Sequence, residues 1–149
     1  MDQLNEIKII DFITESREAI PSINLTYQLF GKQLGDAPVI LINHALTGNS
    51  NLTGKNGWWK EVVGEDRAIN TKKFSIISFN IPGNGFCSND FYHPDKFHLG
   101  DIANLFILAL EHLKIKKLGI SQTVLYAHMQ YDHMPYAHMQ YDHMLYAHM

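Results

Sequence analysis

The sequence predicts an α/β domain built on a mixed, mainly parallel β-sheet with flanking helices, and two patterns carry this prediction. The first is residues 39–42, Val-Ile-Leu-Ile, a short apolar run in which three side chains are β-branched. Such a run is typical of a strand buried on both faces, as in a parallel sheet. The second is the alternation of predicted strands and helices after residue 39, which favours parallel pairing with right-handed crossovers that place helices on the sheet faces.

Each element of this sheet has its own signal in the chain. Residues 8–13 have a β-rich composition, and residues 24–30 alternate apolar and polar side chains. We expect these two strands to pair as an antiparallel edge. The clearest helix carries one apolar stripe, formed by Ile102, Leu105, Phe106, Ala109, Leu110 and Leu113. The predicted strands are 8–13, 24–30, 39–42 and 74–80, with a further strand starting at 117–120, and the predicted helices are 57–64 and 100–113.

Composition excludes several classes of protein. With 46% hydrophobic and 18% charged residues, the 149-residue chain has the composition of a globular protein. The net charge of -3 does not favour a nucleic-acid partner, and the single cysteine, Cys87, rules out an internal disulfide. The longest uncharged apolar run, 105–110, is too short to cross a membrane, and the N-terminus does not resemble a signal peptide. We therefore expect a cytoplasmic protein.

The chain divides into two parts of different composition. Residues 1–120 have ordinary domain composition, whereas residues 121–149 hold a five-residue repeat that begins Tyr-Ala-His-Met-Gln and Tyr-Asp-His-Met-Pro. A period of five fits neither a helix nor a strand, so we expect this low-complexity tail to be disordered. We hypothesise that it replaces the native continuation of the domain. Weak capture of copper or nickel by its His and Met residues is an alternative role, but we predict no metal site in the domain.

The loops that follow two predicted strands form the candidate ligand site. Strand 39–42 runs into His44-Ala45-Leu46-Thr47-Gly48, and strand 74–80 ends at Asn80 before a glycine-rich loop. Open α/β sheets bind ligands at the carboxyl ends of their parallel strands. Both loops are therefore predicted to lie at the edge of the sheet where ligands bind.

These loops also carry a family resemblance over residues 5–120. The segment Asn43-His44-Ala45-Leu46-Thr47-Gly48, followed by Gly57-Trp58-Trp59 and by a strand that ends in Asn80, resembles the first part of an α/β-hydrolase, and within that superfamily homoserine O-acetyltransferase. The resemblance implies an incomplete fold, the N-terminal part of an α/β-hydrolase. The loop at 82–88 is closer to the general hydrolase pattern Pro-Gly-x-Gly-x-Ser, which keeps a serine ester hydrolase open as an alternative.

The resemblance implies a serine acyltransferase that moves an acetyl group from acetyl-CoA to homoserine, in methionine biosynthesis, by a Ser-His-Asp triad. It implies no cofactor, since acetyl-CoA is the acyl-donor substrate, and it is compatible with a homodimer of the full-length family; we expect no nucleic-acid or membrane partner. The backbone N–H of Leu46 maps onto one oxyanion-hole donor. The residues that map onto the substrate-binding loops are His44, Ala45, Thr47, Gly48 and Asn80.

The nucleophile elbow expected after residue 120 is not present in the sequence. The chain reads Ser121-Gln122-Thr123, without the glycines of the pattern Gly-x-Ser-x-Gly, and the acid and base that should follow are absent as well. We therefore expect this chain to be inactive, and a non-catalytic fragment is a further alternative. We also expect strand 39–42 and one face of helix 100–113 to lack partners, which predicts low solubility and no cooperative melting.

Two further residue types leave alternatives open. His44 could be a catalytic base, but the base of this family comes late in the chain, so a structural histidine that fixes the oxyanion loop is favoured. Trp58 and Trp59 could stack on a ligand, or at least one of them could pack the predicted short helix on the sheet.

Overall fold

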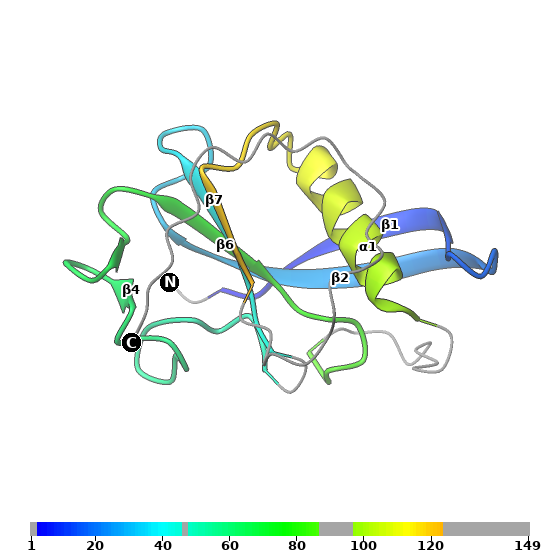
Figure 1. Ribbon diagram of the computed structural model, residues 1–149, viewed down its shortest axis with the longest axis horizontal. Helices are drawn as coiled ribbons and strands as arrows, with labels where there is room; N and C mark the ends of the chain where they lie inside the picture. Colours follow the sequence, from blue (N-terminus) through cyan, green and yellow to red (C-terminus); the bar gives the residue numbers. More distant parts are fainter. Residues whose placement is uncertain (1–2, 46–47, 87–96, 124–149) are drawn as a thin grey trace.

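The computed structural model describes residues 3–45, 48–86 and 97–123, which form a mixed sheet with one helix packed on it (Figure 1). The main sheet has five strands in the order β1-β2-β6-β3-β7, so the predicted α/β class is confirmed. Its strands are β1 (Asn5–Ile13), β2 (Ala19–Gly31), β3 (Val39–Asn43), β6 (Ser75–Phe79) and β7 (Ile120–Thr123). The helix is α1 (Leu99–His112), and a small second sheet joins β4 (Val63–Gly64) to β5 (Ile69–Asn70).

The pairing of the strands matches the predicted antiparallel start. β1 pairs antiparallel with β2 and β2 antiparallel with β6, whereas β3 runs parallel to β6 on one side and to β7 on the other. Because β3 has a partner along each edge, the expectation that strand 39–42 lacks partners is wrong. The premise for poor cooperativity therefore does not hold for this strand.

Strand β3 is buried on both faces, as its sequence predicts. Val39 and Leu41 belong to the core beneath α1, whereas Ile40 and Ile42 belong to a second core on the opposite face. Burying a side chain of this size contributes about 1.5–3 kcal/mol. The second core includes Phe30, Leu52, Val63 and Ile76, with Trp59, Ile69 and Phe74 packed against it.

Helix α1 covers the face of the sheet beside β1 (Figure 1). Its predicted stripe is confirmed, since Leu105, Phe106, Ala109 and Leu110 are all buried. Asp101 is fully buried in the first turn: its Oδ2 accepts the His98 N–H at 2.8 Å and its Oδ1 accepts the Glu15 N–H at 2.7 Å. The start of the helix is thereby tied to the turn between β1 and β2. Among the described residues, no helix has the length and hydrophobicity of a transmembrane span.

The predicted helix at 57–64 is wrong. The segment makes a single turn, in which the N–H groups of Val62 and Val63 both donate to the carbonyl of Trp59 at 2.9 Å, and then enters β4. Val63 is β-branched and fully buried in the second core, so packing against the sheet outweighs the weak helical signal of so short a segment.

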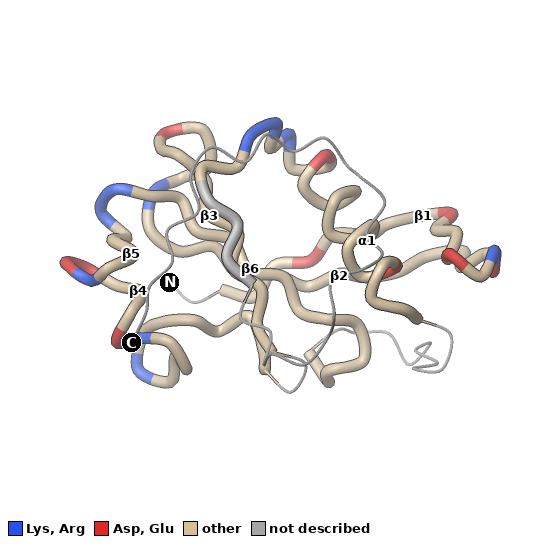
Figure 2. Tube along the Cα trace, in the orientation of Figure 1, with Lys and Arg blue, Asp and Glu red and all other residues tan. Residues whose placement is uncertain are grey.

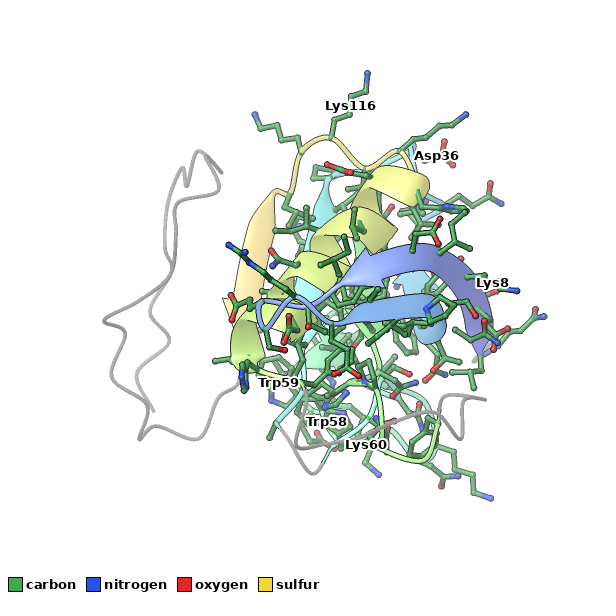
Figure 3. The ribbon with its side chains drawn as sticks, turned by 90° about the vertical axis from the view of Figure 1, so that its right-hand side faces the viewer. Lys8, Asp36, Trp58, Trp59, Lys60 and Lys116 are labelled. Carbon is green, nitrogen blue, oxygen red and sulfur yellow. The ribbon has the colours of Figure 1, made fainter. Side chains whose placement is uncertain are left out.

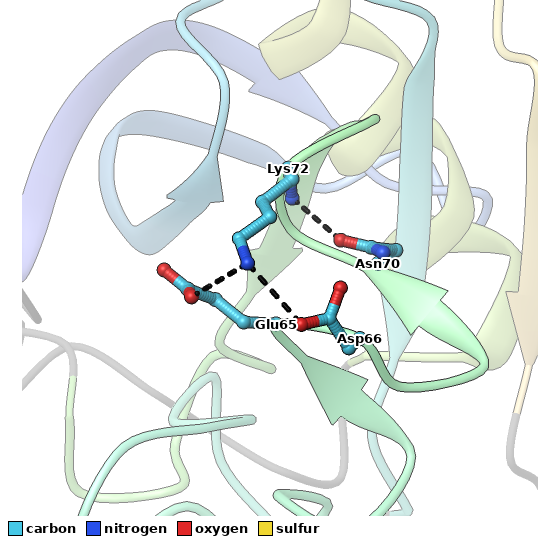
Figure 4. A network of polar contacts seen from close by, with 4 residues as sticks. All are labelled: Glu65, Asp66, Asn70 and Lys72. Atoms are coloured by element: carbon cyan, nitrogen blue, oxygen red, sulfur yellow. Dashed lines mark hydrogen bonds and ion pairs between the residues drawn. The ribbon is translucent and has the colours of Figure 1, made fainter.

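A cluster of exposed charges joins the turn between β4 and β5 to the residues just after β5 (Figure 4). The Lys72 Nζ lies 3.1 Å from an oxygen of Glu65 and 3.2 Å from an oxygen of Asp66, and the Lys72 N–H donates to the Asn70 Oδ1 at 2.8 Å. Glu65, and then Asp66, raise the pKa of Lys72. All three charged side chains are largely exposed, so this cluster is a surface feature of the small sheet.

The last described strand extends beyond the domain boundary predicted at residue 120. Ser121 pairs with Leu41 inside β7, so it lies within a strand and not at a strand-to-helix turn of the kind that a nucleophile elbow requires. The rest of the predicted tail, residues 124–149, lies outside the described residues.

Candidate functional site

The candidate site lies where β3 and β6 end. These strands are parallel neighbours, so the loops that follow them leave the same edge of the sheet. Neither loop contains Asp, Glu, Lys or Arg between residues 43 and 50 or between 80 and 86. Figure 2 shows charged positions elsewhere, on the β1–β2 turn, around β4 and β5 and before β7. Within the described parts of these two loops, polar contacts are therefore made by backbone groups and neutral side chains.

His44 fastens the two loops to each other. Its Nε2 accepts a hydrogen bond from the Ile81 N–H at 3.3 Å, and its Nδ1 lies 2.7 Å from the carbonyl oxygen of Ala45. Because Nε2 accepts, the proton must reside on Nδ1, which donates to Ala45. The side chain is only 3% exposed, and burial lowers the pKa of His44. Neither nitrogen is available as a base, so the arrangement favours a positioning role for His44.

A backbone bond also holds the loop after His44. The carbonyl of Ala45 accepts the Gly48 N–H at 2.7 Å, which ties Gly48 to the residue after His44. A Cβ at Gly48 would lie 3.1 Å from the oxygen of Ala45 and from the Cβ of His44, so a larger residue would press on both. Leu46 and Thr47 themselves lie outside the described residues, and the role of the Leu46 N–H stays a prediction.

Asn80 is the centre of a buried polar network. Its Oδ1 accepts the Ser50 N–H at 2.8 Å and an Nδ2–H of Asn84 at 3.0 Å. Its own Nδ2 donates to the Oγ1 of Thr26 at 2.9 Å and to the Oγ of Ser50 at 3.0 Å. The hydrogen-bonding capacity of the amide is thus fully used. Asn80 is 0% exposed, and its role in substrate binding stays a prediction.

Further bonds connect this network to β2 and to the second loop. The Ser50 Oγ–H donates to the Gln28 Oε1 at 2.7 Å, and the Thr26 Oγ1–H donates to the carbonyl of Phe86 at 2.9 Å. The amide of Asn84 also donates to the carbonyl of Gly48 at 3.3 Å. Sequence reasoning missed Thr26, Gln28 and Ser50. The sequence indicated that Thr26 and Gln28 share one face of β2, because they are alternate residues of a strand. It did not indicate that this face is buried, since polar residues in an alternating strand normally face solvent.

The glycine-rich loop after β6 has the backbone that its composition predicts. Gly83 and Gly85 have φ values of 87° and 85°, in the left-handed region that favours glycine. The Phe86 N–H donates to the Oδ1 of Asn84 at 3.1 Å, which holds this loop against the network.

Trp58 and Trp59 stack on each other, with ring centroids 5.4 Å apart and an interplanar angle of 14°. Trp59 packs against the second core, whereas Trp58 is 39% exposed. Figure 3 shows both on the lower side of the molecule. Of the two interpretations that the sequence left open, packing applies to Trp59. Trp58 is exposed, so stacking on a ligand stays a prediction for that residue.

A separate hollow of about 700 Å³ lies at the opposite, amino-terminal end of the parallel strands. It is lined by the start of β3, the preceding turn and the connection from α1 to β7, and it shares no residue with the loops described above. In the described part of the chain, no group of three or more His, Cys, Asp or Glu residues could hold a metal ion.

Solved structures that the chain matches are α/β-hydrolases. The chain matches the structure of esterase E22 with a TM-score of 0.68 at 21% identity, covering 83% of this chain and 40% of that one. It matches the homoserine O-acetyltransferase from Staphylococcus aureus with a TM-score of 0.69 at 26% identity, covering 81% of this chain and 38% of that one. The chain therefore has the fold of an α/β-hydrolase, of which it contains the N-terminal part.

Within this class, the sequence is homoserine O-acetyltransferase-like. It is 32% identical over 126 residues to the homoserine O-acetyltransferase of Methanosarcina acetivorans. The matched region covers 72% of this chain and 23% of that protein. It is 36% identical over 99 residues to the enzyme of Corynebacterium efficiens, covering 62% and 26% respectively. The chain thus spans about a quarter of the length of these curated relatives. No family model matches the sequence.

Proposed function

We propose that the described residues form the oxyanion side of a serine acyltransferase that moves an acetyl group from acetyl-CoA to homoserine. The observation that carries this proposal is the double attachment of the loop after β3. His44 holds one end of the loop to Ile81, and Ser50 holds the other end to Asn80. An oxyanion donor must be fixed before negative charge develops, and this attachment fixes the residues on both sides of Leu46 and Thr47.

In this mechanism the Leu46 N–H donates to the carbonyl oxygen of the thioester as that oxygen becomes an oxyanion. Losing one such donor lowers the rate by about 10²–10³. His44 and Asn80 hold the loop, while Ala45, Thr47 and Gly48 border the acyl group. No cofactor takes part. The attacking serine, its base and its acid are not supplied by any residue that the sequence pattern identifies, so the chain by itself is proposed to be inactive.

A serine ester hydrolase is the second candidate, with water in place of homoserine as acyl acceptor. The loop that begins Pro82-Gly83-Asn84-Gly85 and the match to esterase E22 favour it. A non-catalytic fragment is the third candidate, favoured by the missing triad. In each case we propose a cytoplasmic protein with small-molecule partners and no nucleic-acid partner, and for the full-length acyltransferase a homodimer in methionine biosynthesis.

One assay separates these candidates. The release of CoA from acetyl-CoA is measured for this chain and for a version extended by the downstream half of a homoserine O-acetyltransferase, each with and without homoserine. We expect no release from this chain and homoserine-dependent release from the extended one. Release without homoserine favours the hydrolase, and the extended chain with its nucleophilic serine changed to alanine is the control. A stable acyl adduct on this chain would contradict the proposed inactivity.

A further inference from the structure

Trp58 is an exposed aromatic residue with a fixed orientation at the edge of the candidate site. One face of its ring stacks on Trp59, at a centroid distance of 5.4 Å, yet the residue remains 39% exposed. Its indole N–H donates to the carbonyl of Asn49 at 2.8 Å, and its backbone N–H donates to the carbonyl of Asn51 at 3.2 Å. The polar edge of the ring is thus satisfied within the protein, and the apolar ring is available to a ligand.

The anchor of Trp58 belongs to the loop that the proposed mechanism uses. Asn49 directly follows Gly48, whose N–H donates to the carbonyl of Ala45. A ligand that contacts Trp58 would therefore lie against the loop after β3.

Positive charge lies close to Trp58 in the chain. Lys60 is exposed and follows Trp58 by two residues, and Figure 3 labels both on the lower side of the molecule. Residues 48–60 contain two lysines and no acidic residue, and the following Glu61 is paired with Arg67 at 3.3 Å. Neither Lys55 nor Lys60 forms an ion pair within the described ranges. An exposed aromatic ring with exposed lysines nearby in the chain suits a ligand that is both planar and anionic.

We propose that Trp58 and Lys60 bind the adenine-nucleotide part of the acyl donor, with the adenine ring stacked on Trp58 and a phosphate group near Lys60. This inference rests on the proposed function, because acetyl-CoA is the donor named there. A free adenine nucleotide has the same chemistry, so the test includes both.

Tryptophan fluorescence reports on this pair alone, since Trp58 and Trp59 are the two tryptophans of the chain. The full chain is titrated with CoA, with adenosine 3′,5′-bisphosphate and with pantetheine, which lacks the nucleotide. We expect saturable quenching by CoA and by the bisphosphate, and none by pantetheine. Equal quenching by CoA and pantetheine, or none by CoA, would overturn the proposal. Quenching by the bisphosphate but not by CoA would overturn the assignment to the acyl donor.

Matched variants locate the contact. Trp58→Leu removes the stacking ring and should weaken CoA binding about tenfold, measured by calorimetry, whereas Trp58→Phe keeps an aromatic ring and should bind within about threefold of the original chain. Lys60→Ala should weaken binding and reduce its salt dependence. Lys116→Ala, an exposed lysine at the other end of the molecule (Figure 3), is the control. Unchanged binding in Trp58→Leu, or an equal loss in Lys60→Ala and Lys116→Ala, would contradict the site.

This test is independent of catalysis. CoA binding that depends on Trp58, in an extended chain that does not acetylate homoserine, would overturn the proposed function and leave the nucleotide contact standing. If an extended chain acetylates homoserine but Trp58→Leu does not weaken its CoA binding, the nucleotide contact is overturned and the proposed function stands.

Discussion

The backbone N–H of Ser50 donates a hydrogen bond of 2.8 Å to the side-chain oxygen of Asn80, across 30 residues of sequence. Both residues are almost completely buried, and the bond joins the loop after β3 to the end of β6. The two loops of the candidate site are therefore held together by a buried side chain.

Replacing Asn80 should destabilise the fold. Asn80→Ala leaves the buried Ser50 N–H without its acceptor and removes the bonds that Asn80 donates to Thr26 and Ser50, which we expect to lower the free energy of unfolding by about 2–3 kcal/mol. Urea denaturation measures this change. Asn84→Ala is the control. Because Asn84 is only half-buried, this substitution should lower the free energy of unfolding by about 1 kcal/mol. Equal losses in the two variants would contradict the central place of Asn80.

His44 should make stability depend on pH. Burial lowers the pKa of His44 below its ordinary 6.5, so between the folded value and 6.5 the unfolded chain binds a proton that the folded chain does not. Stability from this group is therefore complete above pH 6.5 and is lost as the pH falls from there toward the folded pKa. Thermal unfolding at a series of pH values measures the slope. His44→Gln, which cannot titrate, should make the slope shallower, and an unchanged slope would contradict this account.

The loop after His44 should reject a side chain at residue 48. Gly48→Ala places a Cβ 3.1 Å from the backbone oxygen of Ala45 and from the Cβ of His44, neither of which can move freely. We expect a loss of about 1–3 kcal/mol in the free energy of unfolding. Gly64→Ala is the matched control: its Cβ would meet the flexible side chain of Arg67 at 3.1 Å, so the loss should be smaller. A loss in Gly48→Ala that is no larger than the loss in Gly64→Ala would contradict this expectation.

The charged cluster on the small sheet should contribute nothing measurable to stability. Lys72 is exposed, and water screens its interactions with Glu65 and Asp66. We expect Lys72→Ala to unfold at the same denaturant concentration as the original chain, and added salt to leave the two curves superimposed. A shift of the midpoint that disappears in high salt would contradict this expectation.

The sequence predicted best where local pattern and burial agree. Strand 39–42 and the stripe of helix 100–113 were placed within one residue of β3 and α1, because a continuous apolar run and a helical repeat leave few alternatives. β2 was predicted to start at residue 24 but starts at Ala19. Pro21 looks like a break in the strand, yet it lies in β2 opposite Asp11, which has a positive φ of 53°.

The rest depended on contacts between distant parts of the chain. Residues 57–64 were assigned to a helix because their packing against the sheet, which draws Val63 into β4, is not visible in a local window. For the site, the sequence located the loops and Asn80 but not their support. Thr26 and Gln28 are polar residues of a strand, and only the fold reveals that they face Ser50 and Asn80 and not water.

The carboxylate of Asp101 has a consequence for how the molecule opens. It accepts hydrogen bonds from the N–H of His98, at the start of its own helix, and from the N–H of Glu15, in the turn between the first two strands. The outer hairpin and the helix should therefore detach as one piece, and native-state amide exchange would then give one opening free energy for both, separate from that of the parallel strands.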